Sequence, residues 1–224
     1  MSTKRIFFLG ILMAVQSARA DWVIIQKTTT AGQDQQMTMK IKDNMIRNDI
    51  GGSMTVLLNG NDGWAQMFMH DTKTVMRMDP EMIKGMGALA GKFMGGDAEP
   101  PKIKATGEKV KVGQWDSEVY TWEGKMGSGR FYVAKSFPKF GDLNKAMDKL
   151  SKAMANPMSR LFPNNTDFPG MVVKSEMKMM GQVTTSELVS ANEQSVSDDD
   201  FKAPEGYKEQ KMPGLPGGST PKQR

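Results

Sequence analysis

The chain has 224 residues, with 30 Lys and Arg against 25 Asp and Glu, and it contains no Cys. It is long enough to form one domain around its own hydrophobic core, and disulfide bonds are excluded. Three of the basic residues lie in the first twenty positions and four lie after Tyr207, so the segment between them is close to neutral. This balance argues against a nucleic-acid partner, which would require a basic surface.

The first twenty residues have the organisation of a secretory signal. Lys4 and Arg5 form a basic start, residues 6–15 are apolar, and Ala18-Arg19-Ala20 is a small-x-small cleavage motif. We expect cleavage after Ala20 and a periplasmic location. The apolar run is too short to cross a bilayer as a helix, and no later run is longer, so the mature chain is not expected to span a membrane.

Residues 22–78 have the pattern of a meander of β-hairpins. Runs rich in β-branched or alternating apolar residues are separated by Gly-, Asn- and Asp-containing turns, and such short, evenly spaced strands are typical of an antiparallel sheet. The predicted strands are residues 22–30, 35–42, 45–50, 54–58, 64–70 and 74–78.

A first helix is predicted near residues 80–95. Asp79 is a candidate N-cap, and Pro80 occupies the first helical position. Apolar residues follow at helical spacing: Met82, Met86, Leu89 and Phe93. Three glycines interrupt the segment, and each costs about 1 kcal/mol relative to Ala in a helix interior. We therefore expect a marginal helix that moves unless it is packed.

The remainder of the chain repeats this arrangement. Strands are predicted at residues 102–112, 115–123 and 130–134, and a second, amphipathic helix near residues 142–155 carries Met147 and Leu150 on its apolar stripe. A last hairpin covers residues 171–180 and 182–192. The domains expected are a signal peptide at 1–20, one β-rich domain at 21–208 and a disordered Pro- and Gly-rich tail at 209–224.

Methionine is unusually abundant, with 22 residues, many of them in Met-x-Met pairs. Successive side chains of a strand point to opposite faces, so each pair places two thioethers on the same face. The same alternation predicts that Val173, Ser175, Met177 and Met179 share a face. The plain interpretation is an ordinary core, because Met is a flexible apolar filler.

A second interpretation uses the same geometry to form a ligand cavity. If the sheet curls, its concave face could bind acyl chains or mixed hydrophobic ligands, because Met side chains repack around varied shapes. The expected lining residues of the sheet are Met37, Met39, Ile41, Met67, Met69, Met76, Met78, Val173, Met177 and Met179. The expected covering residues of the helices are Met82, Met86, Leu89, Phe93, Met147 and Leu150.

A third interpretation is a site for Cu(I) or Ag(I), since thioethers favour soft cations. The segment from Met67 to Met69 is followed by His70, the single imidazole of the chain. The alternation, however, places His70 on the strand face opposite Met67 and Met69 unless His70 lies beyond the strand end.

Catalytic motifs are weak. With one His and no Cys, a hydrolytic triad would have to use His70. Asp198-Asp199-Asp200 lacks the spaced oxygen ligands of a divalent-cation site. The glycine-rich stretch at residues 124–129 lies between two predicted strands, which indicates a hairpin turn rather than a phosphate loop. We expect no enzyme activity, no cofactor and no metal site formed by these residues.

Several stretches carry a family resemblance. They are Thr106 to Gly113 leading into Glu118-Val119-Tyr120, then Phe131 to Lys135, Gly170 to Lys174, and the closing Asp200-Phe201-Lys202-Ala203-Pro204-Glu205-Gly206-Tyr207. Together with the Met-x-Met strands, they resemble an uncharacterised family of exported bacterial proteins with a domain of unknown function. That family is similar in architecture to the outer-membrane lipoprotein carrier LolA and LppX-like proteins.

The resemblance implies an α+β fold, namely an open, curved antiparallel sheet (a half-barrel) with inserted helices covering its concave face. It also implies a hydrophobic cavity and no catalytic residues. We therefore expect a periplasmic carrier of a hydrophobic or lipid-like ligand. The alternative is a structural envelope protein that acts through contacts with other envelope proteins.

Overall fold

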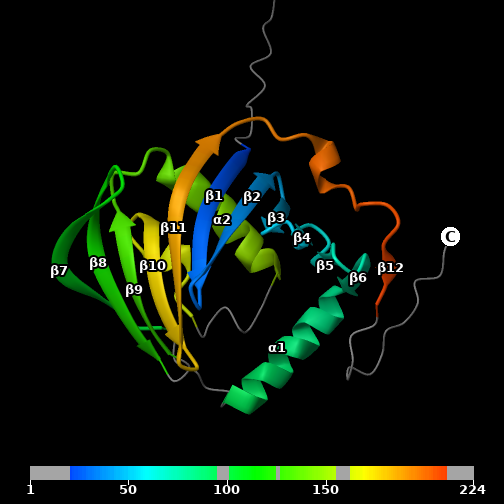
Figure 1. The fold of residues 1–224 in the computed structure, drawn as a ribbon, viewed down its shortest axis with the longest axis horizontal. Coiled ribbons are helices and arrows are strands. Elements are labelled where there is room, and N and C mark those ends of the chain that lie inside the picture. Colours follow the sequence, from blue (N-terminus) through cyan, green and yellow to red (C-terminus); the bar gives the residue numbers. More distant parts are fainter. Residues whose placement is uncertain (1–20, 95–100, 125–126, 155–161, 211–224) are drawn as a thin grey trace, which may run out of the picture.

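The computed structural model describes residues 21–94, 101–124, 127–154 and 162–210, without the side chains of 89–94 and 149–154. Twelve strands form one sheet in the order β12-β6-β5-β4-β3-β2-β1-β11-β10-β9-β8-β7. The sheet curves around helix α2 (Figure 1). The bounds are β1 Trp22–Thr30, β2 Gln33–Lys42, β3 Met45–Ile50, β4 Met54–Asn59, β5 Trp64–Met69, β6 Thr74–Met78, α1 Pro80–Met94, β7 Ile103–Val112, β8 Trp115–Gly124, β9 Gly127–Ala134, α2 Phe140–Met154, β10 Met171–Met179, β11 Gln182–Glu193 and β12 Lys208–Glu209.

The fold class predicted from the sequence is confirmed. All neighbouring strands pair in antiparallel fashion except β12, which lies parallel to β6. Strands β1 to β6 follow one another as hairpins, as do β7 to β9 and β10 to β11, and the pairing of β1 with β11 joins the two halves. Neither described helix is long and apolar enough to cross a membrane.

Tight turns set the register of the hairpins. Ala31 and Gly32 between β1 and β2 have φ values of 50° and 78°, and Met180 and Gly181 between β10 and β11 have 48° and 81°. Positive φ at both central residues gives the turn twist that matches the twist of paired strands. Because the loops contain two residues each, the pairing partners along both hairpins are fixed.

The largest buried cluster lies between the sheet and α2. Leu143 of α2 is fully buried, and Ala146 and Met147 of the same helix pack against the cluster. The sheet contributes residues from both halves, including Ile41 and Val173, which are 1% and 0% exposed. The amphipathic stripe predicted for the second helix therefore packs on the sheet over its described part.

The segment after β11 crosses the sheet face opposite this cluster. Lys40 forms an ion pair with Asp200 at 2.6 Å, and Arg47 Nη1 donates a hydrogen bond to the backbone oxygen of Asp200 at 2.9 Å. Further along, Tyr207 packs against the buried Leu57, Phe68 and Val75. This segment covers a face that would otherwise expose apolar side chains.

The segment then continues into β12, which was not predicted. Lys208 and Glu209 form this short parallel strand beside β6, so the expectation that disorder begins at 209 is corrected at that residue. The backbone N–H groups of Lys208 and Gln210 donate to Lys73 O and Val75 O, both at 2.9 Å. These bonds satisfy the outer edge of β6, since an uncovered edge invites pairing with another chain. Residues 1–20 and 211–224 lie outside the described structure.

Candidate functional site

Seven methionines lie on one face of strands β2 to β6. Met37 pairs with Ile50, which pairs with Met54, and Met54 pairs with Met69. The next row runs from Met39 through Asn48 and Val56 to Met67 and Met76, and the third ends at Met78. Directly paired residues of an antiparallel sheet share a face. We call this set the methionine face: Met37, Met39, Met54, Met67, Met69, Met76 and Met78.

Burial decreases across this face from one row to the next. The third row runs from Ile41 through Ile46, Leu58 and Ala65 to Met78, and its members Ile41, Ile46 and Ala65 are at most 9% exposed. Ile41 and Ile46 belong to the cluster that contains Leu143 of α2. The methionines of the other rows are half-buried, and Met69 is 37% exposed. A contiguous apolar surface thus extends from the core into a partly open region. An exposed apolar patch of this kind marks an interaction site more often than does a scattered single residue.

A polar side chain, Asn48, lies among the methionines. Asn48 Nδ2 donates to Met37 Sδ at 3.5 Å, while Asn48 Oδ1 is buried and has no partner among the described residues. A buried acceptor without a partner costs about 1–3 kcal/mol, so it is an unusual feature of a folded protein.

Helix α2 borders the methionine face. Met147 packs against the main cluster, and its sulfur accepts a hydrogen bond from Asn165 Nδ2 at 3.5 Å. Met39 packs against the same cluster. The sequence-predicted residues Met39, Ile41, Val173 and Met147 are therefore brought together, but as part of the core.

Helix α1 follows β6 directly, and its side chains are described for residues 80–88. Asp79 caps it, with its side chain accepting from the Met82 backbone N–H at 2.7 Å. The described side chains of α1 join none of the three buried clusters, and Met86 is 36% exposed. The helix extends from the end of β6 across the lower part of the view in Figure 1. The side chains of Leu89, Phe93 and Leu150 lie outside the described residues.

Strand β10 departs from the predicted alternation. The register of β10 against β9 shifts between Val172 and Lys174. Val173 belongs to the cluster under α2, whereas Met177 packs against a second cluster that contains Trp122, Phe131 and Phe168. A bulge inserts one residue and re-aims the side chains that follow it. The expectation that Val173, Met177 and Met179 line one continuous wall is corrected accordingly.

His70 does not join the methionines. Its Nε2 lies 2.9 Å from Thr55 Oγ1, and its Nδ1 lies 2.5 Å from the Tyr207 hydroxyl. Both partners belong to the face opposite Met67 and Met69, as the alternation of the strand predicted. Among the described residues, no three His, Cys, Asp or Glu side chains form a group that could hold a metal ion.

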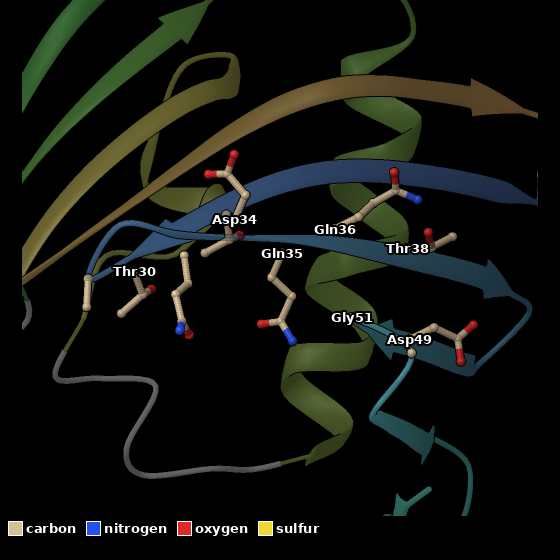
Figure 2. A pocket seen from close by; sticks show the side chains of 11 residues that line it. Thr30, Asp34, Gln35, Gln36, Thr38, Asp49 and Gly51 are labelled. Carbon is tan, nitrogen blue, oxygen red and sulfur yellow. The ribbon is translucent and has the colours of Figure 1, made fainter. Parts of the chain in front are cut away.

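A polar pocket lies at the end of the β1–β2 hairpin. Its volume is about 850 Å³, and Figure 2 shows Gln35 pointing to one side of β2 while Asp34 and Gln36 point to the other. Asp34 accepts from Lys27 at 2.7 Å, and this bond together with one from Thr29 lowers the pKa of its carboxyl. The pocket contains none of the residues predicted to bind a ligand.

Sequence reasoning missed two members of the site. Met54 begins a predicted strand but has no Met two residues away, and its place depends on the strand opposite. In the sequence, Asn48 is a polar residue close to a predicted turn. The pairing of β3 with β2 and β4 places it among the methionines.

A family model described as a domain of unknown function, DUF4412, matches residues 8–207. The chain belongs to this family. No curated protein matches the chain. The family thus accounts for nearly all of the described structure, and its description names no activity.

Solved structures resemble the chain weakly. A chain of the MucA/MucB complex from Pseudomonas aeruginosa has a TM-score of 0.44 at 10% identity, over 83% of this chain and 56% of that one. A LolA superfamily protein from Nitrosomonas europaea has 0.33 at 11% identity, over 82% and 90%. PNGF-II has 0.41 at 9% identity, over 86% of this chain, which spans 31% of its length. With TM-scores below 0.5, these likenesses assign no activity to the chain.

Proposed function

We propose that the protein binds a hydrophobic or lipid-like ligand on the methionine face and acts as a periplasmic carrier without catalysis. The observation that carries this proposal is the pairing register of β2 to β6, which gathers seven methionines on one half-buried face. The periplasmic location is supported by the signal pattern in residues 1–20.

Thioether side chains suit such a ligand for a physical reason. Met has three rotatable side-chain bonds and a polarizable sulfur, so a face made of Met adapts to acyl chains of different shape. Covering a half-exposed Met removes apolar area from water and contributes about 1 kcal/mol per side chain. Asn48 Oδ1 would accept a hydrogen bond from the polar end of the ligand.

Helix α1 supports the proposal because none of its described side chains joins a buried cluster of the sheet. Its described side chains leave the methionine face partly open, and its glycine content makes it a weak helix. A helix of low intrinsic stability that follows β6 directly could move when a ligand binds.

The test is a displacement titration with a fluorescent fatty acid, combined with native mass spectrometry of protein purified from a bacterial envelope. Met67→Lys places a charge in the middle of the face and is expected to weaken binding of the fatty acid at least about tenfold, because the ammonium group opposes burial of an acyl chain. Met180→Lys is the matched control, since Met180 is 85% exposed outside this face.

Urea unfolding of both variants shows whether each remains folded. Wild-type protein that carries no co-purified lipid and binds no fatty acid would contradict the carrier role and favour the alternative, a structural envelope protein. Equal weakening in Met67→Lys and Met180→Lys would also remove the methionine face as the site.

A further inference from the structure

The beginning of β2 extends beyond the strand beside it. Residues 33–36 pair with β1, but the pairing of β2 with β3 begins only at Met37, opposite Ile50. The β3–β4 turn starts at Gly51, whose backbone N–H donates to Gln36 O at 2.9 Å. The polar pocket described above lies in this recess, between the start of β2 and the turn (Figure 2).

The pocket and the methionine face share one side of β2. Gln33 and Gln35 line the pocket, and the alternation of the strand places them on the same side as Met37. Thr28 of β1 is paired directly with Gln35 and lies on this side as well. Residues two apart in a strand are about 6.6 Å apart, so Gln35 is the immediate neighbour of the row from Met37 to Met69. A ligand on the methionine face can therefore extend into the pocket.

Gly51 leaves room for the side chain of Gln35. A Cβ at position 51 would overlap Gln35 Nε2 and lie 2.7 Å from Gln35 Cγ, and the φ of Gly51 is 55°. The Gln35 side chain therefore lies over the Gly51 backbone, in a space that only glycine leaves open. This contact positions the Gln35 amide at the boundary between the pocket and the methionine face.

The lining of the pocket is uncharged on the methionine side. Its polar groups there are the amides of Gln33 and Gln35 and the hydroxyls of Thr28 and Thr30. An amide supplies two N–H donors and a carbonyl acceptor, and a hydroxyl supplies both a donor and an acceptor. Both glutamines are exposed, so a ligand can reach their amides. This combination matches the hydroxyl groups of a polyol.

The charged groups of the pocket lie on the other side of β2 and are paired. Asp34 forms an ion pair with Lys27 at 2.7 Å, and Asp49 forms one with Arg47 at 2.8 Å. The described residues that line the pocket include no Lys, Arg or His. A phosphate or carboxylate would therefore lack the cationic partner that favours its binding. The pocket thus favours an uncharged group.

We propose that this pocket binds the head group of an amphiphilic ligand, and that the head group is uncharged and carries hydroxyl groups, as glycerol or a sugar does. The pocket volume of about 850 Å³ is sufficient for such a group. The acyl chain of the ligand lies on the methionine face, so this inference rests on the carrier function proposed above.

The test compares two amphiphiles that have the same acyl chain, laurate and 1-monolauroylglycerol, as competitors of a fluorescent fatty acid on the purified full chain. Both are used below their micelle concentrations. The variant is Gln33→Ala/Gln35→Ala, and the matched control is Gln114→Ala/Gln194→Ala, two exposed glutamines outside the pocket. An uncharged head group favours any apolar site, so the difference in preference between the proteins is the decisive measurement. Urea unfolding verifies that both variants are folded.

We expect wild type and control to bind monolauroylglycerol at least about tenfold more tightly than laurate. The Gln33→Ala/Gln35→Ala protein is expected to lose most of this preference, because two hydrogen bonds correspond to roughly tenfold in affinity. An equal preference in this variant and in wild type, or a preference of wild type for laurate, would overturn the head-group site and leave the carrier function standing. Displacement by neither amphiphile would overturn both.

Discussion

His70 and Tyr207 lie 137 positions apart in the chain, yet His70 Nδ1 and the Tyr207 hydroxyl are 2.5 Å apart. Thr55 Oγ1 donates to Asp49 Oδ1 at 2.6 Å, so its proton is not available to His70. His70 Nε2 therefore donates to Thr55, and Nδ1 accepts from Tyr207. A chain of hydrogen bonds connects the C-terminal segment to β3, β4 and the end of β5.

Tyr207→Phe removes the hydroxyl from this chain and retains the ring, which packs edge-on against Phe68 at 5.4 Å between centroids. We expect the free energy of unfolding to fall by about 1 kcal/mol, the usual contribution of a hydrogen bond. Tyr207→Ala also removes the ring and is expected to cost more. Urea denaturation measures both changes.

The control for Tyr207 is Glu205→Ala, an exposed position two residues earlier in the same segment. This substitution is expected to leave the urea midpoint unchanged. A Tyr207→Phe protein as stable as wild type would show that the described hydrogen bond does not hold the segment on the sheet.

Asp49 predicts a dependence of stability on pH. Burial raises the pKa of its carboxyl, but hydrogen bonds from Arg47 and Thr55 outweigh burial, and the net pKa is lowered from 3.8. A carboxyl whose pKa is lowered by folding stabilises the protein above its unfolded pKa, and this contribution is lost as the pH falls through the folded pKa. Asp49→Asn should therefore be less stable than wild type at pH 7, and the difference should shrink below pH 3.8.

Urea titrations from pH 7 to pH 3 measure this difference. Asp71→Asn, at an exposed position in the β5–β6 turn, serves as the control and is expected to have the stability of wild type at pH 7. A difference between Asp49→Asn and wild type that grew as the pH fell would contradict the described role of Asp49.

Leu143 anchors α2 in the core. It is fully buried, so Leu143→Ala removes methyl groups from a packed site and is expected to lower the free energy of unfolding by about 2–5 kcal/mol. Lys145→Ala on the same helix is the control, because its ion pair with Asp142 is exposed and 3.8 Å long. Comparable losses in the two variants would mean that α2 is not held through Leu143.

Gly170 lies where the chain enters β10. A Cβ at this position would overlap Ala134 O and lie 2.7 Å from Lys135 Cα, both of which are backbone atoms. Gly170→Ala is therefore expected to be strongly destabilising, and thermal unfolding would show a lower Tm. At Gly141 in the first turn of α2, an added Cβ meets nothing within 4 Å, so Gly141→Ala is expected to keep Tm or raise it slightly, because Ala favours a helix more than Gly does. A Gly170→Ala protein as stable as wild type would show that this close approach does not constrain the backbone.

The sequence by itself determined the local pattern. Side chains alternate along a strand, so the grouping of Met37 with Met39 and of Met67 with Met69 follows from spacing alone. The apolar stripe of α2 and the N-cap at Asp79 are equally local, and both were predicted because they depend on residues a few positions apart.

The tertiary structure decided which of these local groups meet. Met54 opposes Met69 because a hairpin register joins β4 to β5, and Tyr207 reaches His70 because the chain returns across the sheet after β11. The bulge in β10 separates Met177 from Val173, although strict alternation groups them. Periodicity reports the direction of a side chain within its own strand, whereas pairing, bulges and long returns depend on contacts between distant segments that no short window of sequence contains.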